Sequence, residues 1–173
     1  GSMRVQVQKL AQKDVWQTNL FDGATVTKDS KINMGNLTIN GTSIDTTNKS
    51  YSDLVTEINK ISGVQASLIE SSDGKFRLAI KSTETGTANK INFNTKDISG
   101  NDLGVSSGAA KLFGDGSALS DSLNVLKAQD MQLKADGVDY SSSSNTITID
   151  GLKITATKKG GDSTINIEND TTT

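Results

Sequence analysis

The sequence predicts a mainly β protein with minor α content, an α+β fold arranged in two small lobes. Short stretches such as Leu37/Ile39 and Ile147/Ile149 alternate between apolar and polar residues, a period of two that is typical of strands with one buried face. Asn-Gly and Asp-Gly pairs separate many of these stretches and favour hairpin turns. Residues 51–61 have the i, i+3, i+4, i+7 spacing of an amphipathic helix.

The composition indicates thin sheets rather than one large core. Ser, Thr, Asn and Gly together supply 71 of the 173 residues, whereas Phe, Trp and Tyr together make up 4%. Small polar residues suit turns and the solvated faces of strands, and they add little apolar area to an interior. A chain of this length can form one medium domain or two small ones.

Charge and residue content exclude several classes of function. The net charge is −2 and the basic residues are scattered, whereas a nucleic-acid surface needs clustered positive charge. No apolar run approaches the roughly 20 residues of a membrane span. Cysteine and histidine are absent, which rules out disulfides and removes the commonest general base and zinc ligand. We therefore expect no nucleic-acid partner and no membrane.

The first part of the chain is predicted to contain a strand, an irregular segment and a hairpin. Residues 5–11 begin with strict alternation and indicate a strand. Residues 12–31 show no clear period and are expected to be irregular with one short strand. Asn40-Gly41 then predicts a hairpin between the alternating residues on either side.

The amphipathic segment 51–61 is predicted to form a helix of about three turns that packs on a sheet by one face. Ser50 can cap its N-terminus, and Asp53 stands where the acid of a capping box belongs. Gly63 marks the C-terminal stop.

A second hairpin is predicted after this helix. Residues 64–68 and 76–80 alternate on either side of Asp73-Gly74, a pair that supplies the positive φ of a tight turn. Residues 90–93 are expected to add a further strand. The segment 36–94 therefore has the order ββ-α-βββ, a small α+β unit.

The rest of the chain is predicted to be a glycine-rich connector followed by strands. Residues 97–118 contain five glycines and no clear period, and residues 119–127 permit a short helix. Turns are expected at Asp136-Gly137, Asp150-Gly151 and Gly160-Gly161. The strands between them are expected around Met131/Leu133, Val138/Tyr140, Ile147/Ile149, Leu152/Ile154 and Ile165/Ile167.

These elements predict two lobes. Residues 4–31 and 119–170 are expected to form a discontinuous β domain, a meander or sandwich-like arrangement built from both chain ends. Residues 32–96 are expected to form an inserted α+β domain, and residues 97–118 to connect the two. Residues 1–3 are interpreted as a cloning scar, and the last four residues as a cut end.

Candidate carboxylates for catalysis are better interpreted as turn residues. A glycosidase needs two carboxyl groups that face one cleft, whereas Asp73, Asp136 and Asp150 each precede a glycine. Asp-Gly turn chemistry explains these positions fully. No serine is singled out as a nucleophile, so the sequence predicts no catalytic residue and no enzyme.

Other candidate sites are also weak. Residues 97–102 and 115–117 superficially resemble calcium loops but lack the EF-hand order, and residues 114–117 do not form a phosphate-binding loop. Trp16 is interpreted as a packing anchor. We expect no metal and no cofactor site. Asn-x-Ser/Thr triplets are attributed to chance; they begin at Asn36, Asn40, Asn48 and Asn169.

Three stretches, in order, resemble the FliD-type family of flagellar filament cap proteins. Residues 5–11 are similar to a V-x-V-x-x-L-A pattern. The middle stretch resembles a G-x-L strand, a helix that ends I-N, a G-V-x-A strand and an R-L strand. The middle stretch contains Gly35-Asn36-Leu37, Ile58-Asn59, Gly63-Val64-Gln65-Ala66, Arg77-Leu78 and Thr85-Gly86. The last stretch is residues 128–157, and its resemblance is carried by Ala128-Gln129-Asp130, Asp136-Gly137, Ser144-Asn145-Thr146 and Gly151-Leu152.

The resemblance implies a mechanical function. Cap proteins of this family form a homo-oligomeric ring at the distal tip of the bacterial flagellum, outside the cell, after export by the flagellar secretion system. They promote the polymerisation of flagellin, and their helical, coiled-coil terminal regions make much of the filament contact. This chain would be the head without those regions, and in isolation we expect it to be monomeric.

Other classes stay open from the sequence. Met131 and Lys153 depart from the family pattern, and hook and hook-filament junction proteins share some of these features. A binding module, either an adhesin or a carbohydrate-binding β domain, is the alternative from a different class. Heptad helices beside this segment would favour the cap protein, and further β repeats would favour an adhesin.

Overall fold

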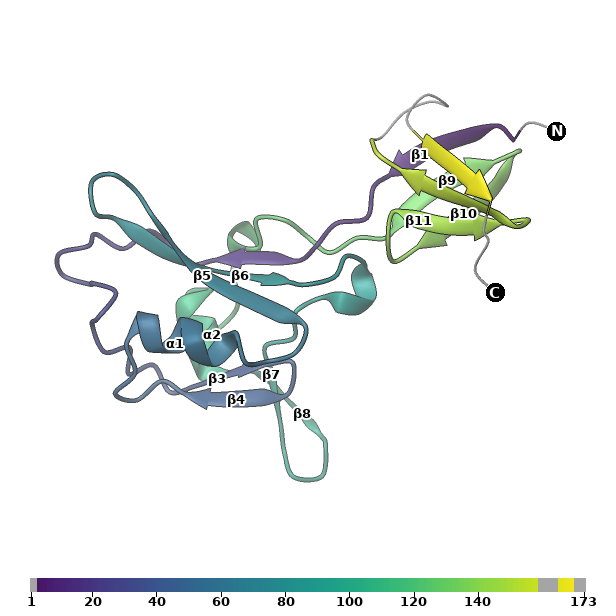
Figure 1. Ribbon diagram of the computed structural model, residues 1–173. Helices are drawn as coiled ribbons and strands as arrows, with labels where there is room; N and C mark the ends of the chain where they lie inside the picture. The colour runs from purple at the N-terminus through teal and green to yellow at the C-terminus, as the bar shows by residue number, and fades with distance from the viewer. Residues whose placement is uncertain (1–2, 159–164, 170–173) are drawn as a thin grey trace. The chain divides into compact units, whose positions relative to one another are not determined.

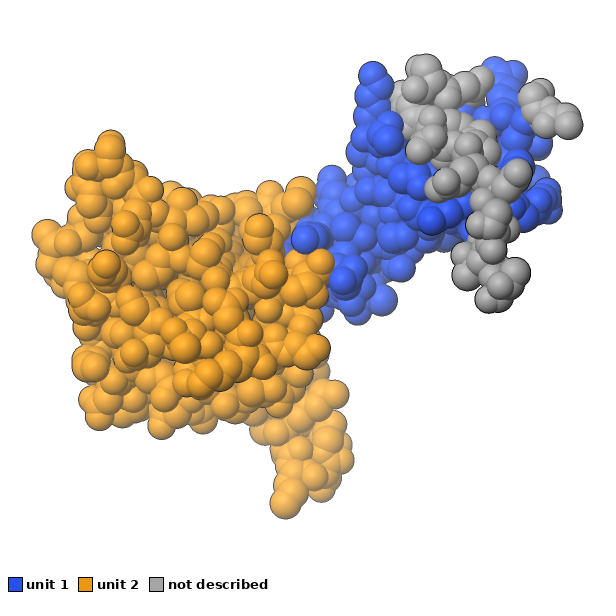
Figure 2. Space-filling view, viewed as in Figure 1, with its two compact units in different colours: residues 1–14, 84–90, 127–173 blue, residues 15–83, 91–126 orange. Residues whose placement is uncertain are grey.

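A computed structural model describes residues 3–158 and 165–169, which fold as two compact units (Figures 1 and 2). Unit 1 comprises residues 1–14, 84–90 and 127–173, and unit 2 comprises residues 15–83 and 91–126. Both chain ends belong to unit 1, and the chain passes four times from one unit to the other. Each unit has its own hydrophobic core.

Unit 1 consists of two three-stranded antiparallel sheets. Their strand orders are β1-β9-β10 and β11-β12-β13, and side chains from both sheets share one core, as in a small sandwich. The strands are β1 (Val5–Lys9), β9 (Met131–Ala135), β10 (Val138–Ser142), β11 (Thr146–Ile149), β12 (Leu152–Ala156) and β13 (Ile165–Asn169).

The turns of unit 1 follow the local chemistry of their residues. Asp136 and Asp150 have φ of 47° and 50°, and each is followed by a glycine with positive φ, the geometry of a two-residue type I′ hairpin. The alternating residues of the strands point inward: Val5, Val7, Met131, Leu133 and Ile154 are at most 3% exposed.

Unit 2 is built from a three-stranded sheet, two hairpins and two helices. The sheet has the order β2-β6-β5, and the hairpins are β3-β4 and β7-β8. The strands are β2 (Val15–Gln17), β3 (Asn36–Ile39), β4 (Thr42–Asp45), β5 (Val64–Glu70), β6 (Phe76–Ser82), β7 (Asn94–Lys96) and β8 (Asp102–Val105), and the helices are α1 (Tyr51–Ile58) and α2 (Ser107–Leu112).

Helix α1 begins with the predicted capping box. The Ser50 hydroxyl accepts a hydrogen bond from the Asp53 N–H at 3.0 Å, and the Asp53 carboxylate accepts one from the Ser50 N–H at 3.1 Å. The helix has eight residues, about two turns rather than the predicted three. After Ile58 the backbone N–H groups of Lys60 and Ile61 bond three residues back, at 3.2 and 2.9 Å. The Asn59 side chain binds both backbone groups of Ala66 on β5, at 2.8 and 3.0 Å.

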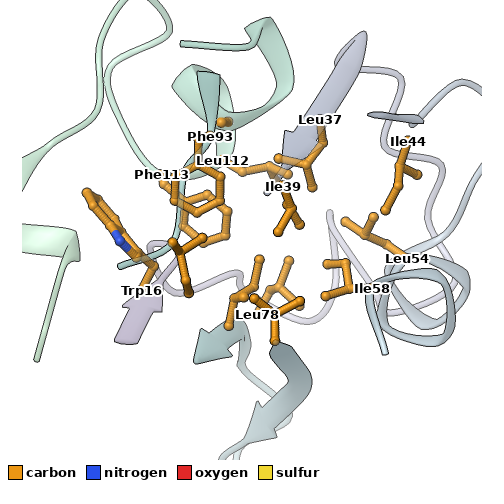
Figure 3. Packing of buried hydrophobic residues seen from close by; sticks show 14 of the residues in the cluster. Trp16, Leu37, Ile39, Ile44, Leu54, Ile58, Leu78, Phe93, Leu112 and Phe113 are labelled. Carbon is orange, nitrogen blue, oxygen red and sulfur yellow. The ribbon is translucent and has the colours of Figure 1, made fainter. Parts of the chain in front are cut away.

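The core of unit 2 collects side chains from nearly every element of the unit. Figure 3 shows those of α1 and the β3-β4 hairpin meeting those of β6, β2 and α2. Trp16 lies at one side of this core, with its ring edge-on to Phe93 (centroids 5.5 Å apart) and Phe113 (6.2 Å). At 5% exposure, it packs as an interior side chain.

The glycine-rich segment 97–118 is not a connector, which corrects the sequence prediction. It forms β8 and α2 and belongs to unit 2, where Ala109, Leu112 and Phe113 are buried. Gly108 makes this packing possible, because a Cβ there would lie 2.8 Å from the carbonyl oxygen of Asn36 on β3. The helix approaches the strand more closely than any side chain at that position allows.

Two further predictions about unit 2 are corrected. Residues 15–31 belong to unit 2 rather than to the lobe built from the chain ends, because β2 pairs with β6 through Trp16 opposite Ile80. Residues 119–127 form only a 3₁₀ turn over Asp121–Leu123, since Leu126 instead exchanges backbone hydrogen bonds with Val15 at 2.8 and 3.4 Å.

The predicted strand at residues 90–93 begins later, as β7 at Asn94. Ile91 and Phe93 do alternate into the core, but the backbone N–H of Asn92 binds the Asn40 side chain at 3.0 Å. A side-chain partner replaces the ladder that a strand would form.

The predicted fold class, mainly β with minor α, is confirmed. In the described part of the chain, no helix has the length and apolarity that crossing a bilayer requires. The predicted turn at Gly160-Gly161 and the interpretation of the last four residues lie outside the described residues.

Candidate functional site

The acidic residues considered for catalysis occupy turns in the structure. Asp136 and Asp150 are the first residues of the two type I′ turns. Asp73 accepts hydrogen bonds from the Ser71 hydroxyl and from the Lys75 N–H in the β5-β6 turn. These carboxylates lie in the turns of three separate hairpins, as the turn interpretation describes.

The two segments that resemble calcium loops use their carboxylates for local hydrogen bonds. Asp97 accepts the N–H groups of Asn101 and Ser99, at 2.8 and 2.9 Å, and these bonds, with that of Asn101 the largest cause, lower the pKa of its carboxyl. Asp115 accepts those of Ser117 and Ala118. Within residues 3–158 and 165–169, no three acidic side chains gather into a group that could hold a metal ion.

Parts of the three stretches that carry the family resemblance meet at one place in unit 1, which we call the junction cluster. They are far apart in sequence, yet short hydrogen bonds join them. The cluster consists of Leu10, Ala11, Gln12, Thr85, Gly86, Thr87, Gln129, Asp130, Ser143 and Asn145.

One half of the junction cluster binds the end of the N-terminal strand to the later part of the chain. Gln12 and Gln129 exchange backbone hydrogen bonds of 2.9 and 3.3 Å, and the Gln129 side chain donates to the carbonyl of Leu10 at 2.8 Å. The Ala11 N–H donates to the side-chain oxygen of Asn145 at 2.6 Å. The Gln and Asn side chains thus extend the pairing of β1 and β9 beyond the sheet itself.

The other half holds the short segment 84–90, which returns to unit 1 between two passages through unit 2. The Thr87 N–H and hydroxyl both donate to the Asp130 carboxylate, at 2.9 and 3.3 Å. The Thr85 hydroxyl donates to the carbonyl of Ser143 at 2.7 Å. Gly86 has φ of 101°, and a Cβ there would lie 2.8 Å from Ser143, so this position requires glycine.

The junction cluster lies where the chain changes units. The unit boundaries fall after residues 14, 83, 90 and 126, all within a few residues of the cluster. Its groups bind one another, so the arrangement can anchor chain segments. The sequence showed the short patterns of the family resemblance and their order along the chain. It did not show that some of their residues lie close together in space.

The β7-β8 hairpin of unit 2 presents apolar side chains to solvent. In the β7-β8 hairpin, Ile98 is fully exposed and Leu103 is 62% exposed. Hydrogen bonds from Ser99 and Asn101 to Asp97 hold the turn in a defined conformation. Among the described residues, these are the two most exposed large apolar side chains.

Comparison with known proteins identifies the architecture. The chain is similar to the D2-D3 domains of the flagellar cap protein FliD from Escherichia coli, with 28% identity, a TM-score of 0.61 and coverage of 86% of this chain and 77% of that one. It is also similar to the same domains from Serratia marcescens, with 25% identity, a TM-score of 0.64 and coverage of 98% and 92%. The fold is therefore that of the D2-D3 part of flagellar cap proteins.

Sequence comparison agrees with this class. The chain is 30% identical to the flagellar hook-associated protein 2 of Campylobacter jejuni over 203 aligned positions, which cover 98% of this chain and 31% of that protein. No family model matches. These likenesses support a fragment of a FliD-type flagellar cap protein, and the chain spans about a third of the length of its Campylobacter relative.

Proposed function

We propose that this chain is the head of a bacterial flagellar cap protein, which promotes the polymerisation of flagellin at the distal, extracellular tip of the filament. The observation that carries the proposal is the match to the C. jejuni hook-associated protein 2 over 98% of the chain. The likeness to the D2-D3 domains of E. coli FliD supports it. The partners would be flagellin subunits and other cap protomers, and export would use the flagellar secretion system.

A mechanical role without catalysis is consistent with the chemistry of the described residues. The carboxylates of Asp73, Asp97 and Asp115 accept hydrogen bonds within their own turns, and the polar groups of the junction cluster bind one another. The exposed tip of the β7-β8 hairpin, with Ile98 and Leu103, is the surface of unit 2 that best suits a contact with flagellin or a neighbouring protomer.

Deletion of the full-length gene in its own bacterium tests the proposal. We expect loss of swimming and release of monomeric flagellin into the medium, both reversed by a plasmid copy of the gene. A copy with Ile98→Asp and Leu103→Asp is expected to restore less motility than a copy with Val138→Asp, a matched change at an exposed apolar residue of unit 1. Wild-type swimming of the deletion strain would refute the cap function.

The isolated chain is expected to be monomeric, because the two α-helices of its described residues are eight and six residues long, too short to form a coiled coil. Light scattering at micromolar concentration would measure its mass. A stable ring at that concentration would contradict this expectation.

A further inference from the structure

Strand β4 has an outer edge with unpaired backbone groups. Among the residues that the structure describes, it pairs only with β3, and the Asn40-Gly41 turn sets which residues face that partner. The Thr46 N–H donates to the carbonyl of Gly35, so in the antiparallel alternation Thr42 and Ile44 bond to β3. The N–H and C=O groups of Ser43 and Asp45 therefore point away from it.

The opposite edge of the hairpin confirms this alternation. Thr38 lies across from Ser43, and its N–H points outward, to the hydroxyl of Ser106 at 3.0 Å. The outer groups of β3 are thus covered by the segment that leads into α2. On β4, among the residues that the structure describes, no hydrogen bond is made by the backbone of Ser43 or Asp45, and both residues are exposed.

A groove runs along this open edge. It has a volume of about 360 Å³, with β4 on one side and the C-terminal turn of α1 on the other, which lies beside the hairpin in Figure 1. Ile44, which is buried, and Ile61, which is half-buried, supply its apolar part. An exposed strand edge is the feature used for peptide recognition by strand addition.

The charges of the groove balance. Asp45 and Glu57 are acidic, and Lys49 and Lys60 are basic, with Lys60 paired to Glu57 at 3.4 Å. A groove with two charges of each sign favours a neutral segment over a strongly acidic or basic one. Its small apolar part suits β-branched side chains of moderate size.

Specific contacts cover part of each outer edge of the other sheet in unit 2. On β5, the Asn59 side chain occupies the N–H and C=O of Ala66, as a neighbouring strand would. On β2, Val15 exchanges hydrogen bonds with Leu126. Natural proteins usually block exposed strand edges, whereas the open edge of β4 lies beside a groove.

We propose that the groove between β4 and α1 binds an extended, uncharged peptide segment of another polypeptide, which adds to β4 as a third strand. Ser43 and Asp45 exchange N–H···O bonds with alternate residues of the segment, and a small β-branched side chain contacts Ile44 and Ile61. Main-chain bonding supplies the recognition, so the site tolerates many sequences of this composition. The assignment stands on unit 2 alone and does not depend on the cap function.

The test is an NMR titration of the chain with a capped pentapeptide of alternating threonine and valine. The backbone amide signals of Ser43 and Asp45 are expected to shift most. At a peptide concentration of about ten times Kd the free fraction of the protein is about one eleventh, so hydrogen exchange at these two amides slows about tenfold. The same peptide with N-methyl groups on its three central amides is expected to leave both signals unchanged.

Two variants of the protein complete the test. Ser43→Pro removes an outward N–H at an edge position that tolerates proline, and we expect it to abolish the shifts; Ser43→Ala keeps the N–H and the binding. Unchanged signals of Leu54 and Ile39 show that each variant is folded. If Ser43→Pro fails to fold, the N-methylated peptide decides the question. Equal binding of that peptide, shifts confined to other residues, or no shift up to the solubility limit would each overturn the proposal.

Discussion

At the scale of single residues, carboxylates that accept several backbone N–H groups organise the loops. Asp22 accepts those of Ala24, Thr25 and Val26, at 2.9, 2.8 and 3.1 Å. These bonds, with that of Val26 the largest cause, lower the pKa of its carboxyl from 3.8 to about 2. The loop is thus shaped by one ionised side chain, and its stability depends on pH.

We predict that Asp22→Asn reduces stability at neutral pH and that this difference shrinks in acid. The folded-state pKa lies below the ordinary value, so the contribution of Asp22 is present above about pH 4 and is lost as the pH falls through about 2. Urea unfolding at pH 7, 4, 3 and 2 measures the difference. Asp150→Asn makes the same charge change at a turn carboxylate and controls for net charge; a pH-independent effect at Asp22 would contradict the prediction.

We predict that Gly86→Ala is more harmful than Gly100→Ala. Both glycines have positive φ, 101° and 84°, but a Cβ at Gly86 would lie 2.8 Å from Ser143, whereas none of the surrounding atoms lies within 4 Å at Gly100. The positive φ costs each variant about 1 kcal/mol, and the clash adds about 1–3 kcal/mol at Gly86. Denaturant unfolding compares the stability of the two variants. Equal losses of unfolding free energy would show that segment 84–90 shifts at little cost to make room for the new Cβ.

At the scale of elements, local chemistry predicted the structure wherever hydrogen bonds within a few residues decide it. The capping box of Ser50 and Asp53 starts α1 as expected, and Asn40-Gly41 forms the first hairpin. Helix α2 was missed because its residues include Gly108 and lack a clear apolar period. Its stability comes from burial of Ala109 and Leu112 against β3, a contact that propensity cannot reveal.

In helix α2 we predict a change in stability that is opposite to the change expected from helix propensity. Gly108→Ala would gain about 1 kcal/mol from propensity in an open helix. Here the new Cβ would lie 2.8 Å from the carbonyl oxygen of Asn36 and 3.1 Å from the Leu37 nitrogen, both backbone atoms. We therefore expect a net loss of about 1–3 kcal/mol, measured by urea unfolding, while Ser107→Ala at an exposed position of the same helix causes little change. A gain at Gly108 would contradict the close approach.

At the scale of the whole molecule, the two units have cores that share no residue. Leu133 in unit 1 and Leu54 in unit 2 are both fully buried. We predict that Leu133→Ala and Leu54→Ala each cost about 2–5 kcal/mol and that each lowers hydrogen-exchange protection mainly in its own unit.

Hydrogen exchange followed by mass spectrometry on proteolytic fragments measures this protection. Fragments from residues 131–156 report on unit 1, and those from residues 51–82 on unit 2. An equal loss of protection in both units, from either substitution, would show that the chain unfolds as one cooperative body.

The sequence by itself determined the elements whose geometry depends on neighbouring residues: the alternating strands, the Asn-Gly and Asp-Gly turns, the capped helix and thus the mainly β class. It also contained the ordered patterns of the FliD family. Only the tertiary structure decided that residues 15–31 and 97–118 belong to unit 2, and that Gln12, Thr87 and Asp130 meet in one cluster. These outcomes depend on contacts between residues far apart in the chain, and such contacts leave no periodic signal in the local sequence.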